Sequence, residues 1–498
     1  MSGTKPAAVT GSPFARTAGL PALGRIDPLW VGSVLLLASR VAMALLVPVA
    51  AEDAFITFRF ARSLVEGNGP VFNPGEHVMG FTSLPWMLWV AAGIPLVHDP
   101  MLWTRISAGA LSWVTLACTC RLLDRRVSRT AAWAFVVMFT AWPYFASLPA
   151  SGMEMDLLLA SMALTMWLID RGSIFAGVSL GVLAITRPEC LAAAAVLALV
   201  ARPRDRLIAL GVVLLAVSAL TVYFGSPVPN SMLAKAGVYG TPGPWVGRTW
   251  WEWLFPADLG RAPEASEPVQ LWAIRIVLAP AALAGLWSLR RHRLVALPLA
   301  GLAIWAGYAL LGVAYFFWYF AVPAYTVVVL ASAGLSRVSR GPWIPFAGVL
   351  FVLGTWTIFP IGTYRARAFA EGRLFGRMAV LLGRQSQPGD LLFAEPIGFI
   401  GWYNPRLRIM DETGLVSPEV WKRRRGGPGW YADLVNEHRP TWLLTRAGFL
   451  ENGLAIAGTG APFRSPEEAR QVFADYREAG TSGENPDRPE IVLYRRLP

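Results

Sequence analysis

The segment LWVGSVLLLASRVAMALLVPVAAEDAFITFRFAR, residues 29–62, joins a long apolar run to a short acidic and aromatic continuation. The run at 29–50 is long enough for a transmembrane helix, which needs about 20 mostly apolar residues. Glu52 and Asp53 follow at the point where such a helix leaves the bilayer. Residues 54–62 combine an apolar and aromatic set, including Phe55 and Phe58, with the cations Arg59 and Arg62, which suits a helix lying along the membrane surface. The segment predicts a membrane protein whose first external loop begins with two carboxylates.

The composition of the whole chain supports this interpretation. Of its 498 residues, 55% are hydrophobic and only 15% are charged, with a mean hydropathy of +0.46. These values exclude a disordered chain and disfavour a purely soluble one. The formal net charge is +12, but the basic residues lie in short loops between apolar runs. They are therefore signals of topology, since cytoplasmic loops are rich in Lys and Arg, and we expect no nucleic-acid partner.

Ten more apolar runs follow the first and give about 11 predicted transmembrane helices. These runs lie at 102–123, 131–149, 156–169, 173–186, 190–201, 207–224, 271–289, 294–313, 318–335 and 343–361. A further run, 84–98, has only 15 residues and contains two prolines. If it does not cross, every basic loop falls on the cytoplasmic side. We therefore predict a re-entrant or juxtamembrane helix there, with an ordinary short span as the alternative.

The chain divides into three predicted parts. Residues 1–28 form a cytoplasmic N-terminal tail, 29–361 a transmembrane catalytic domain, and 362–498 a small external α/β domain, because no run after 361 is long enough to span a bilayer. Alternation and turn residues in the last part predict four strands and two helices. The strands are expected at 390–395, 406–411, 441–445 and 490–495, and the helices at 396–403 and 466–479.

The predicted external face carries the polar residues that need an explanation. Asp53 can act as a general base on an acceptor hydroxyl, whereas the plainer alternative for Glu52 and Asp53 is a solvated acidic helix start. Arg187 suits either an anion or an ion pair with Glu189. Lys235 either binds a phosphate or is an ordinary interfacial lysine, whose apolar stem is buried while its ammonium group reaches the membrane surface.

Several function classes find no support in the sequence. No P-loop, dinucleotide fingerprint, zinc pattern or nucleophile elbow occurs in it. The apolar runs are nearly free of charged residues, which disfavours an ion-coupled carrier. His77 and Glu76 lie in a loop rich in Gly and Pro, residues 67–83, but one His beside one Glu is weak evidence for a metal.

Six segments resemble the GT-C superfamily of glycosyltransferases, and in particular the group of the mycobacterial terminal β-(1→2)-arabinofuranosyltransferase. They occur in the same order in that group and cover most of the chain. The segments are EDAFITFRFAR to GFTSLPW (52–86), SGMEMDLLL (151–159), TRPE (186–189), PNSMLAK (229–235), WYFAVPAY (318–325) and PIGFIGWYNPRLRIMDETGLVSPE (396–419). Met79 is a departure, since relatives often have an acidic residue at that place.

The resemblance implies an inverting transferase in the cytoplasmic membrane that works on its external face. Such an enzyme moves one sugar, arabinofuranosyl or mannosyl, from a polyprenyl-phosphate donor to an envelope glycan or glycolipid. Asp53 matches the family's catalytic base, with Glu52 beside it. The expected donor-phosphate ligands are Arg59, Arg187 and Lys235, and the expected acceptor ligands are His77, Glu154 and Asn230. No cofactor is expected to be required, although Glu52 and Asp53 together offer a site for a divalent cation.

Two other functions stay open at this point. A lipid-linked oligosaccharide flippase or exporter would need a polar path through the spans. A non-catalytic membrane scaffold would leave Asp53 dispensable. The enzyme hypothesis predicts that Asp53, Arg59, Arg187 and Lys235 converge on one external cavity that opens to lipid.

Overall fold

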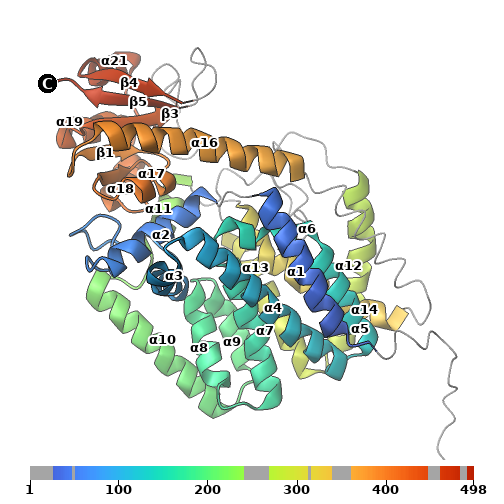
Figure 1. The fold of residues 1–498 in the computed structure, drawn as a ribbon. Coiled ribbons are helices and arrows are strands. Elements are labelled where there is room, and N and C mark those ends of the chain that lie inside the picture. The colour runs from blue at the N-terminus through green and yellow to red at the C-terminus, as the bar shows by residue number, and fades with distance from the viewer. Residues whose placement is uncertain are drawn as a thin grey trace, which may run out of the picture.

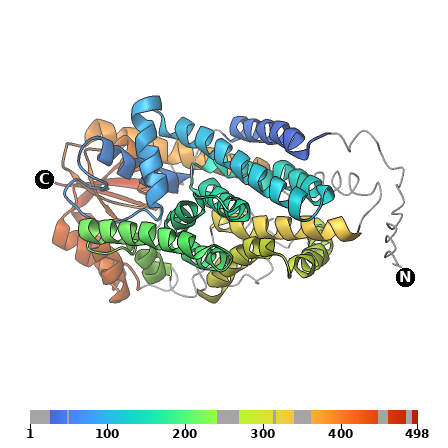
Figure 2. The same ribbon diagram turned by 90° about the horizontal axis from the view of Figure 1, so that it is seen from below.

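The structure is a computed structural model that describes residues 26–47, 51–239, 269–311, 316–338, 361–446, 460–482 and 491–498. A bundle of long helices forms most of the molecule, and a small domain with a β-sheet covers one end of it (Figure 1). In the view turned by 90° from that of Figure 1, the long helices lie roughly side by side, and the sheet domain lies at one end of them (Figure 2).

The helical bundle contains both long and short helices. Its first half comprises α1 (Pro28–Leu46), α2 (Glu52–Val65), α3 (Leu84–Val97), α4 (Pro100–Arg126), α5 (Arg129–Ala141), α6 (Pro143–Ser147), η1 (Pro149–Ser151), α7 (Met155–Arg171), α8 (Ala176–Thr186) and α9 (Cys190–Ala198). The second half comprises α10 (Pro203–Phe224), α11 (Asn230–Tyr239), α12 (Val269–Leu289), η2 (Arg293–Val295), α13 (Ala296–Leu311), η3 (Phe317–Phe320) and α14 (Ala321–Val338).

Within the described residues, five helices are long and apolar enough to cross a membrane, or six if the bent pair Arg129–Ala141 and Pro143–Ser151 counts as one span. Shorter apolar helices accompany them, among them Leu84–Val97 and Ala176–Thr186. The chain is thus a helical protein with several membrane-spanning candidates. The number of about 11 spans stays a prediction, and the run at 343–361 lies outside the described residues except for its last residue.

Local sequence explains how the spanning helices begin and which way they face. The carboxylate of Asp27 caps α1 by accepting from Leu29 N at 3.0 Å, and Pro28 occupies the first turn, where no hydrogen bond is lost. In α10, Leu215 is 73% exposed and Val222 is 88% exposed. Apolar side chains this exposed on a long helix are those of a lipid-facing surface.

The helix α3 has 14 residues, which is short for a span. It packs against α2, α4 and α8. Ser83 caps its N-terminus, and Trp86 Nε1 donates to Gly152 O at 3.2 Å. Its re-entrant or juxtamembrane placement remains a prediction.

The C-terminal part is built on a mixed five-stranded sheet with the order β2-β1-β3-β5-β4. Its strands are β1 (Leu391–Ala394), β2 (Arg408–Asp411), β3 (Trp442–Arg446), β4 (Tyr476–Thr481) and β5 (Ile491–Arg496). Strand β1 pairs in parallel with β2 and β3, and β5 pairs antiparallel with β3 and β4. The helices of this part are α16 (Ile361–Gln385), α17 (Gly398–Tyr403), α18 (Pro418–Arg425), α19 (Trp430–His438) and α21 (Pro466–Ala474).

The four predicted strands are present, but the predicted helix at 466–479 is wrong in its second half. The helix α21 ends at Ala474, and Tyr476–Thr481 is the edge strand β4. The start signal was read correctly, since Ser465 caps Glu468 N at 3.1 Å. Pairing with β5 outweighs the helical tendency of the following residues, which is a tertiary effect that local sequence does not contain.

The two faces of the sheet enter different cores, as the alternation of side chains in a strand requires. Leu392 and Ile409 point into the apolar core that continues into the helical bundle. Phe393 and Met410 point the other way, into a separate core formed with α18, α19 and α21. The sheet domain is therefore packed onto the bundle and is not merely tethered to it.

The contact between the two parts runs along α2. Helix α17 packs on it, and the rings of Phe55 and Phe399 stack with centroids 4.3 Å apart. The guanidinium of Arg62 lies 3.3 Å from the ring centroid of Trp402 and donates to Trp402 O at 2.6 Å. The helix that begins with Glu52 and Asp53 is thus held between the bundle and the sheet domain.

Candidate functional site

Asp53 lies in the first turn of α2, next to a cation from a distant part of the chain. Its Oδ2 is 3.6 Å from Nζ of Lys235 on α11, and both side chains are about one quarter exposed, at 28% and 24%. The start of α2 is fixed because Ala51 N donates to Ser151 O at 2.9 Å. Asp53 therefore sits where a carboxylate stays accessible to solvent or substrate.

Lys235 also lies over an aromatic ring. Its Nζ is 4.4 Å from the ring centroid of Phe316, just before η3. A cation over a ring face is attracted by the electron density of the ring. The ammonium is therefore positioned from two sides, by the carboxylate of Asp53 and by this ring.

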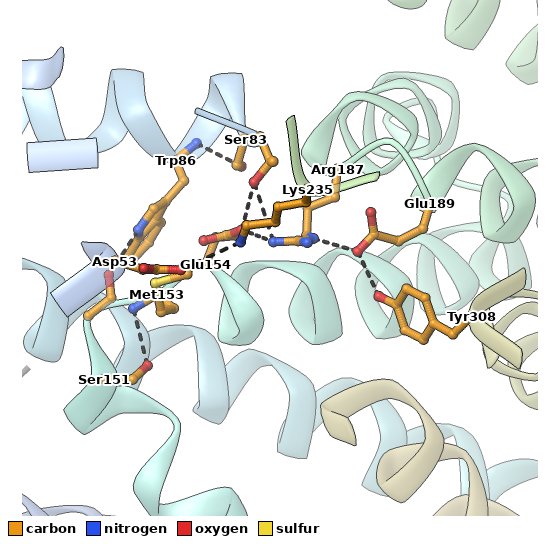
Figure 3. A network of polar contacts seen from close by, with 12 residues as sticks. Asp53, Ser83, Trp86, Ser151, Met153, Glu154, Arg187, Glu189, Lys235 and Tyr308 are labelled. Carbon is orange, nitrogen blue, oxygen red and sulfur yellow. Dashed lines mark hydrogen bonds and ion pairs between the residues drawn. The ribbon is translucent and has the colours of Figure 1, made fainter. Parts of the chain in front are cut away.

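A second network lies beside the first and is buried (Figure 3). The guanidinium of Arg187 contacts the carboxylate of Glu154 and also pairs with Glu189 Oε1 at 2.5 Å. Tyr308 donates to the same Glu189 oxygen at 2.6 Å. Thr82 donates to Glu154 Oε1 at 3.3 Å, so the loop at 67–83 reaches this network.

Charge and burial set the behaviour of this second network. Burial lowers the pKa of Arg187, but Glu189 and Glu154 outweigh burial and raise it well above its ordinary value. Burial raises the pKa of Glu189, but Arg187 and Tyr308 outweigh it and lower that pKa. Both groups are therefore charged at neutral pH. With Asp53 and Lys235 included, three carboxylates face two cations.

The turn that carries Glu154 explains how the two networks come together. Gly152 has φ +76°, a left-handed conformation that glycine adopts without strain, and it directs the chain from η1 into α7. Ser151 stabilises the turn by accepting from Met153 N at 3.2 Å. Backbone carbonyls of the same turn accept hydrogen bonds from Ala51 N and from Trp86 Nε1, so Glu154 is fixed relative to the start of α2.

Glu52 points away from this site, into the sheet domain. Its Oε1 accepts from Gly398 N and, at 3.3 Å, from Phe399 N, which are the first amides of α17. A Cβ at Gly398 would overlap Glu52, so a glycine is required for this close approach. Glu52 thus has a docking contact that sequence analysis did not anticipate, and its predicted catalytic role is not supported by this placement.

Arg59 requires a correction. Its side chain is 3% exposed and donates to the carbonyls of Phe72 at 2.7 Å, Gly401 at 3.1 Å and Leu407 at 2.7 Å, and to Asn73 Oδ1 at 3.3 Å. Burial and the neighbouring Arg62 lower its pKa to about 9, so it is still charged at neutral pH. Its Nη1 and Nη2 donate to carbonyls of the sheet domain and its Nε donates to the loop at Phe72, so all three nitrogens are used in structural contacts and Arg59 is not placed as a donor-phosphate ligand.

Asn230 requires the same correction as an acceptor ligand. Its Nδ2 donates to the carbonyls of Gly414 and Leu415, both at 2.8 Å, and its Oδ1 accepts from Trp421 Nε1 at 3.0 Å. Its amide group is thus used to hold α11 against the sheet domain. His77 is exposed and stands 3.2 Å from Tyr223 O, so its acceptor role remains a prediction.

Three of the four residues predicted to converge, Asp53, Arg187 and Lys235, lie in one region together with Glu154, whereas Arg59 does not join them (Figure 3). The cavity that opens to lipid stays a prediction. Sequence reasoning missed Tyr308, which gives no signal inside its apolar run, and Phe316, which lies just before the resembling segment at 318–325. Among the described residues, three or more ligating groups come together only at Glu419, Glu437 and His438. A cation at Glu52 and Asp53 stays a prediction.

Comparison with known proteins gives one match to a family and one to a curated relative. A family described as "Domain of unknown function (DUF8728)" matches residues 363–494. The terminal β-(1→2)-arabinofuranosyltransferase of Mycobacterium tuberculosis is 31% identical over 130 residues. The match covers 24% of this chain and 20% of that protein, so the chain spans well under two thirds of the relative's length.

Solved structures share the fold over nearly the whole chain. ArnT from Cupriavidus metallidurans bound to undecaprenyl phosphate is 11% identical, with a TM-score of 0.59 and coverage of 93% of this chain and 97% of that chain. The arabinofuranosyltransferase AftD from Mycobacteria is 16% identical, with a TM-score of 0.50 and coverage of 95% and 40%. The oligosaccharyltransferase from Archaeoglobus fulgidus in complex with Zn and sulfate is 12% identical, with a TM-score of 0.51 and coverage of 92% and 72%. The neighbours are all GT-C glycosyltransferases, and the chain has their fold.

Proposed function

We propose that this chain, which has the GT-C glycosyltransferase fold, transfers one sugar from a polyprenyl-phosphate donor to an envelope glycan or glycolipid on the external side of the cytoplasmic membrane. The observation that carries the proposal is the pair of Asp53 and Lys235, 3.6 Å apart at the head of α2. It joins a partly exposed carboxylate in the first turn of α2 to a cation on α11. That the partial relative is named an arabinofuranosyltransferase makes arabinofuranose the first sugar to test, with mannose the second.

The reaction needs a base for the acceptor and a cation for the leaving group. The acceptor hydroxyl oxygen forms a bond to the anomeric carbon while the bond from that carbon to the phosphate oxygen breaks. The hydroxyl proton goes to Asp53, and the bonding electron pair leaves with the polyprenyl phosphate. That leaving group is already an anion, so it needs a cation rather than a proton. Attack from the face opposite the phosphate inverts the anomeric centre.

Lys235 is the cation best placed for the phosphate, because it is partly exposed and lies beside the base. Arg187 is buried and held by two carboxylates, so we assign it a secondary part in binding the donor. Glu154 pairs with Arg187 and is buried with it, so its role as an acceptor ligand stays a prediction beside that of the exposed His77. The apolar surfaces of the bundle would hold the prenyl chain.

The experiment compares the purified wild type with Asp53→Asn in lipid nanodiscs, using labelled arabinofuranosyl and mannosyl polyprenyl phosphates and envelope glycan as acceptor. We expect transfer by the wild type with one of the two donors. The substitution should reduce the rate by about 10²–10⁴, the contribution of a general base. Its thermal unfolding should be unchanged, because a partly exposed ion pair contributes about 0–1 kcal/mol.

The outcome also separates the alternatives. Unchanged transfer by Asp53→Asn would refute the role of the base. Donor binding without sugar transfer by either protein, together with movement of the donor across a liposome bilayer, would favour the flippase. If neither protein transfers sugar, and if Asp53→Asn keeps both donor binding and a normal cell envelope, the scaffold is favoured.

A further inference from the structure

A cavity of about 120 Å³ lies at the seam between the first external loop and the sheet domain. It is separate from the networks around Asp53 and Arg187. Its polar lining comes from both sides of the seam, and its apolar lining includes Met410 and Val416. The polar residues are Glu76, Arg408, Ser417, Glu419 and His438.

One side of this cavity is ordered by hydrogen bonds. It includes Val416 and Ser417 of the turn at 411–417, a turn within one of the resembling segments that has no part in the proposed reaction. Asp411 Oδ1 accepts from Thr413 N at 2.8 Å and Gly414 N at 2.7 Å, and its Oδ2 accepts from Val416 N at 2.7 Å. Ser417 Oγ accepts from Asp411 N at 3.1 Å. A turn held at both ends is preorganised for binding.

The same turn is tied to the candidate site through one short helix. Asn230 is the first residue of α11. Its side-chain Nδ2 donates to two carbonyls of the turn, and its backbone N donates to Met79 O in the first external loop at 2.8 Å. Lys235 follows five residues later on α11, which is about 7.5 Å along the axis of an α-helix. The turn that borders the cavity is therefore connected through α11 to the residue that pairs with Asp53.

The chemistry of the lining fits hydroxyl groups. Glu76 pairs with Arg408 at 2.6 Å, and His438 Nε2 lies 3.1 Å from Glu419 Oε2. The carboxylates accept from hydroxyls, and the guanidinium and Ser417 donate to them. The lining has no surplus of positive charge, which disfavours a phosphate-bearing ligand. A single water needs at least about 10–15 Å³ of such space, so the cavity has room for several waters or for the hydroxyl groups of a sugar.

A divalent cation fits the cavity less well. Glu419, Glu437 and His438 present ligand atoms within 4.8 Å of one another. However, Arg423 already donates to Glu437 Oε2 at 2.8 Å and to Glu419 Oε1 at 3.4 Å. A cation bound there would face this guanidinium and would have to displace it.

We infer that the seam cavity is a subsite for one neutral sugar unit of the acceptor, several units away from the hydroxyl that is glycosylated. The inference rests on the proposed function and deepens it, because it makes the acceptor an oligosaccharide chain read at two places. Glu76, Arg408, Glu419 and His438 bind its hydroxyls, and Met410 and Val416 contact the ring carbons.

The test measures binding of arabinofuranosyl and mannosyl oligosaccharides of two to six units to the full chain in nanodiscs, without donor. Glu419→Gln and His438→Ala are made separately, and Glu437→Gln is the matched control, because Glu437 shares Arg423 but does not line the cavity. We expect each of the first two substitutions to weaken hexasaccharide binding about tenfold, as the loss of one charged hydrogen bond does. Disaccharide binding and the control should stay within twofold of the wild type.

Three results would overturn the subsite. One is that the wild type binds no member of either series. Another is that both cavity variants bind the hexasaccharide like Glu437→Gln. The third is that EDTA abolishes wild-type binding and Ca²⁺ or Zn²⁺ restores it, which would assign the cavity to a cation. Binding that depends on Glu419 and His438 in a protein that transfers no sugar would keep the subsite and reject the proposed function.

Discussion

Two adjacent carboxylates at the head of α2 have opposite environments. Glu52 is directed into the sheet domain, where two backbone amides of α17 donate to one of its oxygens. Asp53 faces the helical bundle, where Lys235 stands 3.6 Å away and about a quarter of each side chain is exposed. One residue along a helix changes direction by about 100°, which follows from 3.6 residues per turn. The acidic pair therefore divides into a residue that docks a domain and a residue that is available for chemistry.

The same division extends along α2. Arg59 and Arg62 donate to carbonyls of the sheet domain, and Phe55 stacks on Phe399. These contacts use the hydrogen-bonding capacity of the side chains and bury them. A residue that binds substrate must keep some of that capacity. Burial with complete pairing therefore marks Arg59 as a docking residue, and the burial of Arg187 and Glu154 leaves Asp53 and Lys235 as the accessible part of the site.

The largest effect is expected at Lys235. Lys235→Met removes the cation beside Asp53 and should reduce transfer about 100-fold or more, the order found when a preorganised electrostatic contact to a reacting group is lost. Lys235→Arg keeps the charge and should retain part of the activity. Rates with saturating donor and acceptor measure the effect. A Met variant as active as the Arg variant would remove Lys235 from the site.

The next effect concerns stability. Arg59→Met leaves several carbonyl groups buried without donors, each costing about 1–3 kcal/mol. We expect a total loss of about 3–5 kcal/mol in the free energy of unfolding. Thermal unfolding and limited proteolysis of the sheet domain measure it, and the exposed Arg384 on α16, changed to Met, is the control. Equal behaviour of the two variants would contradict the docking role of Arg59.

A smaller effect tests whether Arg187 reaches the donor. Glu154→Gln removes one of the two carboxylates that hold it, so the local charge becomes less negative. The donor KM should fall about fivefold, because the substitution removes a negative charge that repels the donor phosphate. At the effective dielectric of a protein site, such a repulsion over several ångström is modest. The acceptor KM should rise, whereas Glu189→Gln should leave it unchanged. An unaltered donor KM in both variants would make Arg187 purely structural.

Sequence reasoning found those features of the site that depend on local order along the chain. The apolar runs and the position of Asp53 directly after the first of them were readable from hydrophobicity along the chain. Four of the five strands in the described part of the sheet domain were readable from side-chain alternation and turn residues. The role of Arg59 was not, because its partners Gly401 and Leu407 lie more than 340 residues away. Basic residues in a loop look alike in sequence, whether they bind phosphate or backbone carbonyls.

The error at β4 has a related cause. Residues 476–481 follow a well-capped helix, and only the distant strand β5 turns them into an edge strand. Long-range pairing outweighed local propensity there. Asn230 is a similar case, because its place in a resembling segment predicts a ligand, whereas its amide holds α11 to the turn at 411–417. The resemblance located the right segments but did not separate binding residues from structural ones.

The smallest effect is the most informative about Glu52. In Glu52→Gln the side-chain oxygen remains and can still accept from Gly398 and Phe399, so only the charge at the start of α17 is lost. A charge at a helix N-terminus contributes about 0.3–1 kcal/mol, and α17 has only six residues, so the loss of stability should lie at the low end. Transfer should stay within twofold of the wild type, with and without EDTA, because Asp53 keeps its place. If Glu52→Gln instead loses transfer as fully as Asp53→Asn, the two carboxylates act as one unit. Rescue by added Mg²⁺ or Mn²⁺ would then identify that unit as the cation site that the acidic pair first suggested.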